Sequence, residues 1–232
     1  MNAAPEKNLP TIARFASGGS GIYATLLAVM AVVLILSNIG ASKGVIIGPL
    51  VTDGGFFLFP LAYIVGDLVS EVYGFKKARL AITVSFLLSI FAAFCYWVII
   101  WLPGAEWYDG QEALERTLGP IPLIVLASLA AFFVGQLFNA WVLVRMKQRT
   151  GERLLFGRIA VSTLAGEFVD TVVFCSIAAP VIGISNISTF ANYVIVGFLF
   201  KSAVEIVLSP VTIAVIGAVK RAEPEYRANS AK

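Results

Sequence analysis

The sequence predicts an all-α integral membrane protein with six transmembrane helices and both termini in the cytoplasm. Three observations predict this class. Apolar side chains make up 59% of the 232 residues and charged ones only 13%, whereas about a quarter of the residues in a soluble domain are charged. The apolar residues form stretches of membrane length, and the basic residues gather in alternate connections between those stretches.

The length of the apolar stretches gives the number of spans. A hydrocarbon core about 30 Å thick needs roughly 20 apolar residues per helix. Six stretches satisfy this requirement, at residues 22–42, 55–74, 79–102, 120–144, 158–182 and 190–219. The first is longer than a signal-peptide core and no cleavage site accompanies it, so we count it as a span. The last is long enough to tilt, or to break near Pro210.

The chain then divides into three parts: a cytoplasmic N-terminal tail at 1–20, a transmembrane domain at 21–220 and a cytoplasmic C-terminal tail at 221–232. Lysine and arginine decide this orientation. If the chain crosses six times, 14 of its 17 basic residues fall on one side, with only Arg116 opposite and Lys43 and Lys201 at membrane depth. Positively charged connections stay in the cytoplasm. The net charge of +3 follows from this topology and predicts no nucleic-acid partner.

The connection at 104–120 carries several acidic residues and should face outward. We expect it to be a solvated surface loop rather than a gate.

Six ionisable residues lie inside the predicted spans as three pairs. The members of each pair are three or four residues apart and therefore share a helix face. The pairs are Asp67 with Glu71, Glu167 with Asp170, and Lys201 with Glu205. An ionised residue at the centre of a membrane helix costs about 3 kcal/mol, while a whole folded protein is stable by only about 5 to 15 kcal/mol. These groups must therefore be paired, protonated or in contact with a wet cavity.

Pairing within the chain cannot neutralise all of these acids. Five carboxylates face one deeply placed lysine, Lys201. The excess favours a cavity that takes protons or a ligand rich in hydrogen-bond donors, a cation included. Two structural alternatives remain open. Glu71 could bridge to Lys76 or Lys77 near the end of its span, and Lys201 with Glu205 could simply stabilise one helix.

Amide and aromatic side chains in the spans are further candidates for ligand contact. Three amides can both donate and accept hydrogen bonds, or can simply join helices: Asn38, Gln136 and Asn139. Four aromatic residues could stack on a flat ligand or only pack: Phe59, Tyr63, Phe133 and Trp141.

The two halves of the chain share a short internal similarity. GDLVSEVY at 66–73 and GEFVDTVV at 166–173 have a glycine, an acid, an apolar residue and two valines in register, and three spans fall in each half. An odd number of spans per half gives the halves opposite orientations. The sequence thus predicts a 3+3 inverted repeat, which in transporters holds the site near the midplane.

Several function classes are excluded by missing residue types. The chain has no histidine, which removes histidine triads, HExxH zinc sites and histidine proton relays, and it has no phosphate-binding GxxxxGK[ST] motif. We expect no metal, no cofactor and no enzymatic activity. An intramembrane aspartyl protease would need a second GxGD motif, and a channel would need a glycine-rich re-entrant filter; the sequence shows neither.

Three segments carry a resemblance to a known family: SNIGASKG at 37–44, FPLAYIVGDLVSEVYGFKKAR at 59–79 and GEFVDTVVF at 166–174. They resemble the queuosine precursor transporter family, also called the vitamin uptake transporter or YhhQ-type family. The resemblance implies import of 7-cyano-7-deazaguanine and 7-aminomethyl-7-deazaguanine across the bacterial cytoplasmic membrane. By motif position it assigns ligand contact to Asn38, Lys43, Asp67, Glu71, Glu167 and Asp170. The residue patterns alone add Gln136, Asn139, Lys201 and Glu205.

Two modes of transport fit this resemblance. In the first, the chain is a secondary importer, with proton coupling through Glu167 or Asp170. In the second, it is the substrate-binding subunit of an energy-coupling-factor transporter and borrows an ATPase from its partners. The expected partners are a small deazapurine and the lipid bilayer, and a homodimer is a further option.

Overall fold

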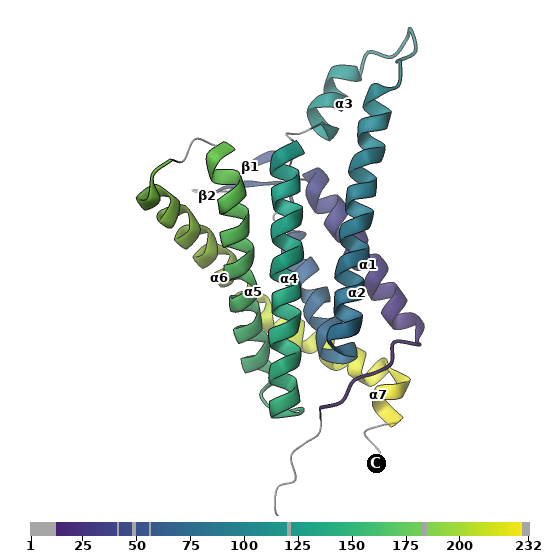
Figure 1. The fold of residues 1–232 in the computed structure, drawn as a ribbon. Helices are drawn as coiled ribbons and strands as arrows, with labels where there is room; N and C mark the ends of the chain where they lie inside the picture. The colour runs from purple at the N-terminus through teal and green to yellow at the C-terminus, as the bar shows by residue number, and fades with distance from the viewer. Residues whose placement is uncertain are drawn as a thin grey trace, which may run out of the picture.

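The computed structural model describes residues 13–40, 42–47, 50–55, 57–119, 122–181 and 185–228. The described chain is predominantly helical and forms an elongated bundle (Figure 1). Its elements are α1 (Gly21–Gly40), β1 (Gly44–Ile47), β2 (Leu50–Asp53), α2 (Phe59–Trp101), α3 (Gln111–Leu118), α4 (Pro122–Thr150), α5 (Leu155–Val181), α6 (Ile187–Ala222) and α7 (Pro224–Ala228).

Within the described residues, five helices are long and apolar enough to cross a membrane. They are Gly21–Gly40, Pro60–Trp101, Leu126–Thr150, Leu155–Ile177 and Ile187–Ala222. Large apolar side chains such as Trp101 on α2 and Val207 on α6 are mostly exposed on the outside of the bundle. Such a surface is unfavourable in water and is suited to lipid. The protein is therefore a multi-pass membrane protein.

The sequence predicted six separate spans, and the structure differs at α2. This helix is 43 residues long and contains one residue with non-helical dihedral angles, Gly74 (φ 79°, ψ 175°). Glycine adopts a positive φ without the steric penalty of a Cβ atom. Gly74 therefore divides α2 into a first leg at 59–73 and a second leg at 75–101, which correspond to the second and third predicted spans.

Contacts with α4 show that the two legs run in opposite directions. Asp67 contacts Asn139, and further along the first leg Glu71 contacts Lys147, so this leg runs parallel to α4. On the second leg, Phe86 packs against Phe133, whereas residues further along, around position 97, share a pocket with position 126. The second leg is therefore antiparallel to α4. Gly74 acts as the turn of a helical hairpin.

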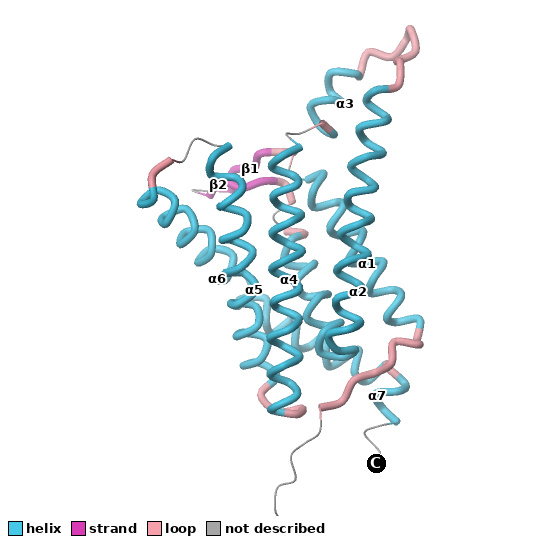
Figure 2. The backbone as a smooth tube through the Cα atoms, in the orientation of Figure 1, coloured by secondary structure: helices cyan, strands magenta, loops and turns pink. Residues whose placement is uncertain are grey.

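A two-stranded antiparallel hairpin follows α1 and was not predicted. Strands β1 and β2 pair with Gly44 opposite Asp53, and the backbone N–H of Gly54 donates to the Lys43 carbonyl at 2.8 Å (Figure 2). The chain passes close to the end of α1, because a Cβ atom on Gly40 would lie 2.9 Å from the Gly54 backbone. Lys43 thus lies beyond the end of α1 with an exposed side chain, not inside a span.

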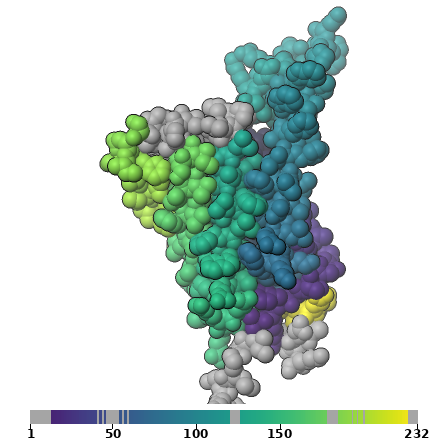
Figure 3. Space-filling view, in the orientation of Figure 1, coloured from purple at the N-terminus to yellow at the C-terminus, as the bar shows by residue number. Residues whose placement is uncertain are grey.

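The connection after α2 is partly helical rather than a plain loop. Helix α3 has no buried residues, and its Arg116 forms an ion pair with Glu112. In the space-filling view, the end of α2 and α3 extend beyond the rest of the bundle (Figure 3).

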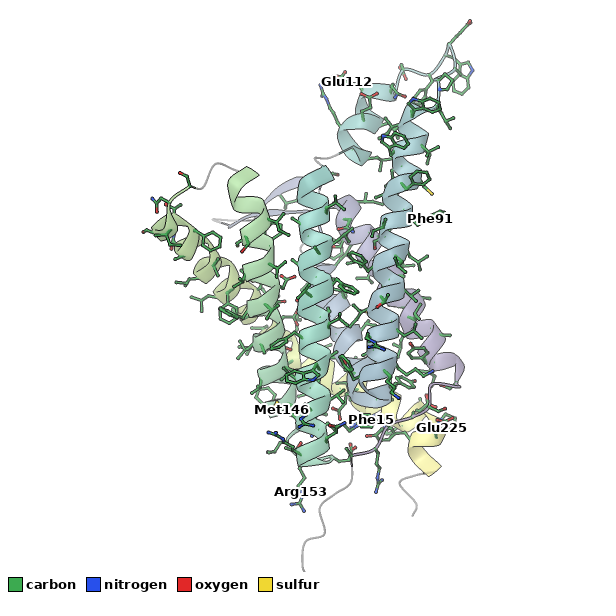
Figure 4. All side chains as sticks on the ribbon, in the orientation of Figure 1. Phe15, Phe91, Glu112, Met146, Arg153 and Glu225 are labelled. Carbon is green, nitrogen blue, oxygen red and sulfur yellow. The ribbon has the colours of Figure 1, made fainter. Side chains whose placement is uncertain are left out.

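The described ends of the chain meet at the opposite end of the bundle. The Ser17 backbone N–H donates to Glu225 at 2.6 Å. Phe15, Met146, Arg153 and Glu225 all lie at this end, away from Glu112 (Figure 4).

Helices α4 and α5 pack unusually closely, which positions the polar residues between them. A Cβ atom on Gly135 would lie 2.7 Å from the Asp170 Cβ, and one on Gly166 would lie 2.6 Å from the Asn139 Cβ. Small residues allow such close approach of membrane helices. Gly66, the glycine of the other similar segment, also faces α4, where a Cβ atom would lie 2.6 Å from the side-chain amide oxygen of Gln136. Helix α6 continues through Pro210 without a break.

Candidate functional site

Polar residues from four helices meet inside the bundle, and we call this set the interior cluster. They come from the first leg of α2, from α4, from α5 and from α6. The members are Tyr63, Asp67, Gln136, Asn139, Glu167, Asp170, Lys201 and Glu205. All are buried except Lys201, whose side chain is 31% exposed.

Asp67 is held by neutral donors on two neighbouring helices. The Asn139 amide donates to its Oδ1 at 2.5 Å, and the Thr163 hydroxyl donates to its Oδ2 at 3.4 Å. On the same face of α4, the Gln136 amide donates to the Ala62 carbonyl at 3.4 Å. These contacts give the two amides a role in joining helices. The Asn139 Oδ1 has no hydrogen-bond partner among the described residues, so this amide can still accept from a ligand.

Lys201 forms an ion pair with Asp170 across the α5–α6 interface. The sequence had left open a pair between Lys201 and Glu205 within one helix. The structure instead directs the ammonium group to the neighbouring helix. The sequence could not show this, because the pairing depends on how two helices face each other.

Glu167 and Glu205 are buried, and Lys201 is near enough to interact electrostatically with both of them. Glu167 faces the hydroxyl of Tyr63, and Glu205 lies near both Asp67 and Glu167. Neither carboxylate forms an ion pair within the described part of the chain. The interior cluster therefore holds four carboxylates and one ammonium group.

Glu71 belongs to a separate group at the end of the bundle where the described termini meet. Its Oε1 lies 2.7 Å from Arg158, 2.7 Å from Lys220 and 3.3 Å from Lys147. Bridging was therefore the right alternative for Glu71, although the expected partners, Lys76 and Lys77, were wrong. The actual partners lie at the ends of three other helices and are far from Glu71 in sequence.

Glu152, in the connection between α4 and α5, completes this basic network. It lies 2.7 Å from Lys220 and 3.3 Å from Lys147, and it accepts a hydrogen bond from the Tyr226 hydroxyl at 2.6 Å. Burial raises the pKa of Glu152, but the hydrogen bonds from Lys220 and Tyr226 outweigh this effect and hold the pKa at about 2. The network ties α2, α4, α6 and the segment after α6 together.

Other predicted ligand contacts lie away from the interior cluster. Asn38 lines a mostly apolar pocket of about 390 Å³ between α1, the second leg of α2, α3 and α4. Phe133 packs on Phe86, and Trp141 is 50% exposed and stacks on Phe138 at the outside of the bundle. The side chain of Phe59 lies outside the described part of the structure.

Comparison with known proteins gives the family. Residues 53–215 match the family described as "Putative vitamin uptake transporter". The chain belongs to this family. The chain is similar to a protein of Bacillus subtilis (strain 168) named "Probable queuosine precursor transporter", with 26% identity over 177 residues, or 76% of each chain. No solved structure matches.

The family match covers every member of the interior cluster, because they lie between Tyr63 and Glu205. It begins after Asn38 and Lys43. Since the family and the relative are transporters, this protein is a transporter and not an enzyme.

Proposed function

We propose that this protein imports queuosine precursors, 7-cyano-7-deazaguanine and 7-aminomethyl-7-deazaguanine, as a secondary transporter. The observation that carries the proposal is the excess of buried carboxylates over cations in the interior cluster. Charged groups inside a membrane protein are energetically costly, and where they are retained they commonly mark a ligand site or an ion pathway. The name of the Bacillus subtilis relative supports the class of ligand.

The ligand chemistry suits the cluster. A deazaguanine edge presents an N1–H and an exocyclic amine, which one carboxylate can accept as a fork. Glu167 is the strongest candidate for this role, since it is buried and has no cation of its own. The free Oδ1 of Asn139 offers a second acceptor, and the ring of Tyr63 lies beside the carboxylates. The ammonium group of the aminomethyl ligand would neutralise part of the remaining negative charge.

We also propose that the two legs of α2 cross the membrane separately, which gives six crossings. At 1.5 Å per residue the first leg is about 22 Å long, so the segment with β1 and β2 would complete that crossing. The basic network and both termini would then face the bacterial cytoplasm, as the positive-inside rule requires. This arrangement also gives the two halves the opposite orientations of a 3+3 inverted repeat.

Uptake in a bacterial strain that lacks de novo queuosine synthesis tests the proposal. The strain carrying the wild-type gene should take up both precursors and regain queuosine in its tRNA. Glu167→Gln should reduce uptake at least ten-fold, while Glu112→Gln, which alters an exposed acid on α3, should leave uptake unchanged. Equal uptake with the wild-type gene and with empty vector would contradict the proposed function.

Purified protein in liposomes distinguishes the two modes of transport. A secondary transporter should move the precursor with no other protein present. Transport only after addition of an ATPase partner would support the energy-coupling-factor mode instead.

A further inference from the structure

Each of the four carboxylates in the interior cluster has a different environment. Asp67 accepts hydrogen bonds on both oxygens and Asp170 is paired with Lys201, and such partners stabilise an ionised carboxylate. Glu167 and Glu205 lack them, because both oxygens of Glu167 and the Oε1 of Glu205 accept no hydrogen bond among the described residues. Glu167 is the carboxylate proposed above for the ligand, which leaves Glu205 as the buried acid without a role.

Glu205 is only 6% exposed, and its Oε1 has no hydrogen-bond partner among the described residues. The charged groups around it come from three elements: Asp67 on α2, Glu167 on α5, and Lys201 on its own helix. Two of these three are acids, and Lys201 is engaged with Asp170. An ionised Glu205 would thus be buried between like charges with an unmatched oxygen, which is strongly unfavourable. Protonation of Glu205 removes its negative charge, and with it both the repulsion from the neighbouring acids and the cost of an unmatched charged oxygen.

A second polar residue on the same face of α6, Ser202, also lacks a hydrogen-bond partner within the described part of the chain. Ser202 lies three residues before Glu205 on the same helix face, is buried, and has no hydrogen-bond partner for its hydroxyl among the described residues. A hydroxyl can both donate and accept, so Ser202 adds a second polar group without a partner in the described structure to the face of α6 that carries Glu205.

We propose that Glu205 binds the coupling proton, and that one proton enters the cell with each molecule of substrate. This inference rests on the proposed function, since it describes how that transport is driven. In the loaded carrier the proton neutralises Glu205 while Lys201 remains on Asp170. After both proton and substrate leave on the cytoplasmic side, Lys201, which lies one turn before Glu205, can neutralise the carboxylate during the return of the empty carrier.

Proteoliposomes containing the purified protein and a trapped pH dye test the proposal. With the membrane potential clamped, addition of 7-cyano-7-deazaguanine outside should acidify the lumen. An imposed gradient, acidic outside, should raise accumulation of the labelled substrate at least ten-fold over the level without a gradient. Exchange of labelled for unlabelled substrate, measured in parallel, reports whether the carrier is intact.

The Glu205→Gln variant should lose this response, with accumulation in the presence and absence of the gradient nearly equal in vesicles that still exchange substrate. Glu205→Asp retains the carboxyl group and should keep the response, and the exposed acid variant Glu112→Gln should match the wild type.

The proposal is overturned if Glu205→Gln responds to the gradient as the wild type does, or if wild-type vesicles exchange substrate without moving protons into the lumen. Wild-type vesicles that neither take up nor exchange substrate would instead contradict the proposed function itself. If the glutamine variant fails to fold, Glu205→Asp still tests the residue: a shifted pH dependence of gradient-driven uptake would support the assignment, and a pH dependence identical to that of the wild type would overturn it.

Discussion

Substitution of Gly166 by alanine should loosen the interface on which the interior cluster is built. A Cβ atom at this position would lie 2.6 Å from the Asn139 Cβ and 3.0 Å from the Gly135 carbonyl oxygen. Carbon atoms in favourable contact are about 3.5–4.0 Å apart, so α4 and α5 would have to separate by about 1 Å. That movement would also pull Asn139 away from Asp67.

Gly157 on the same helix provides a matched control, because a Cβ atom there would have no neighbour within 4 Å. Both variants gain helix propensity, up to about 1 kcal/mol, so most of this effect cancels in the comparison. Overpacking typically costs about 1–3 kcal/mol. We therefore expect Gly166→Ala to be less stable than Gly157→Ala by about that amount, and to transport more slowly.

Reversible unfolding in mixed detergent micelles, followed by circular dichroism, measures the difference. Gly157→Ala should unfold at the same denaturant concentration as the wild type or slightly higher, and Gly166→Ala at a clearly lower one. Equal midpoints for the two variants would refute the close packing of α4 on α5.

Three further predictions concern the bend in α2 and the basic network. Glu71→Gln leaves the buried Arg158 without its carboxylate and Lys147 with Glu152 alone, and should destabilise the protein by about 3–5 kcal/mol, against less than about 1 kcal/mol for the exposed Glu112→Gln, in the same unfolding assay. The pKa of Glu152 is lowered from 4.5 to about 2, so its contribution to stability is present above pH 4.5 and is lost as the pH falls toward 2. Glu152→Gln should accordingly lose less stability than the wild type between pH 6 and pH 3. Gly74→Ala forces a positive φ on alanine and should cost about 1–2 kcal/mol, whereas an unchanged midpoint would argue against the bend.

Hydropathy predicted the course of the helices well, because burial in lipid leaves a strong signal in each span. The division between the second and third spans was also visible in the sequence, where Gly74 is followed by the basic residues of GFKKAR. In the structure the two predicted helices are joined through one residue with non-helical dihedral angles, Gly74. The hairpin of β1 and β2 was missed: its residues, GVIIGPLVTD, fall in the connection between the first two predicted spans, and strands of four residues leave little periodic signal.

All members of the interior cluster were among the predicted residues, but Asn38, Lys43 and Glu71 lie elsewhere, and the pairings could not be predicted. Helical spacing placed Glu167 and Asp170 on one face, and the structure adds Lys201 from a different helix. Spacing could not separate Asp67 from Glu71, one turn apart on the same helix, although the first joins the interior cluster and the second the basic network. Such distinctions depend on which helix faces each residue.

The central claim is that the interior cluster binds a donor-rich deazaguanine, and ligand-dependent thermal stability of the purified protein tests it most directly. A ligand at about 100 times its Kd stabilises the native state by about 2.7 kcal/mol, which is easily detected as a rise in Tm. We predict this rise with 7-cyano-7-deazaguanine or 7-aminomethyl-7-deazaguanine for the wild type and Glu112→Gln, and its loss in folded Glu167→Gln and Asp170→Asn. An undiminished rise in both cluster variants would contradict the account.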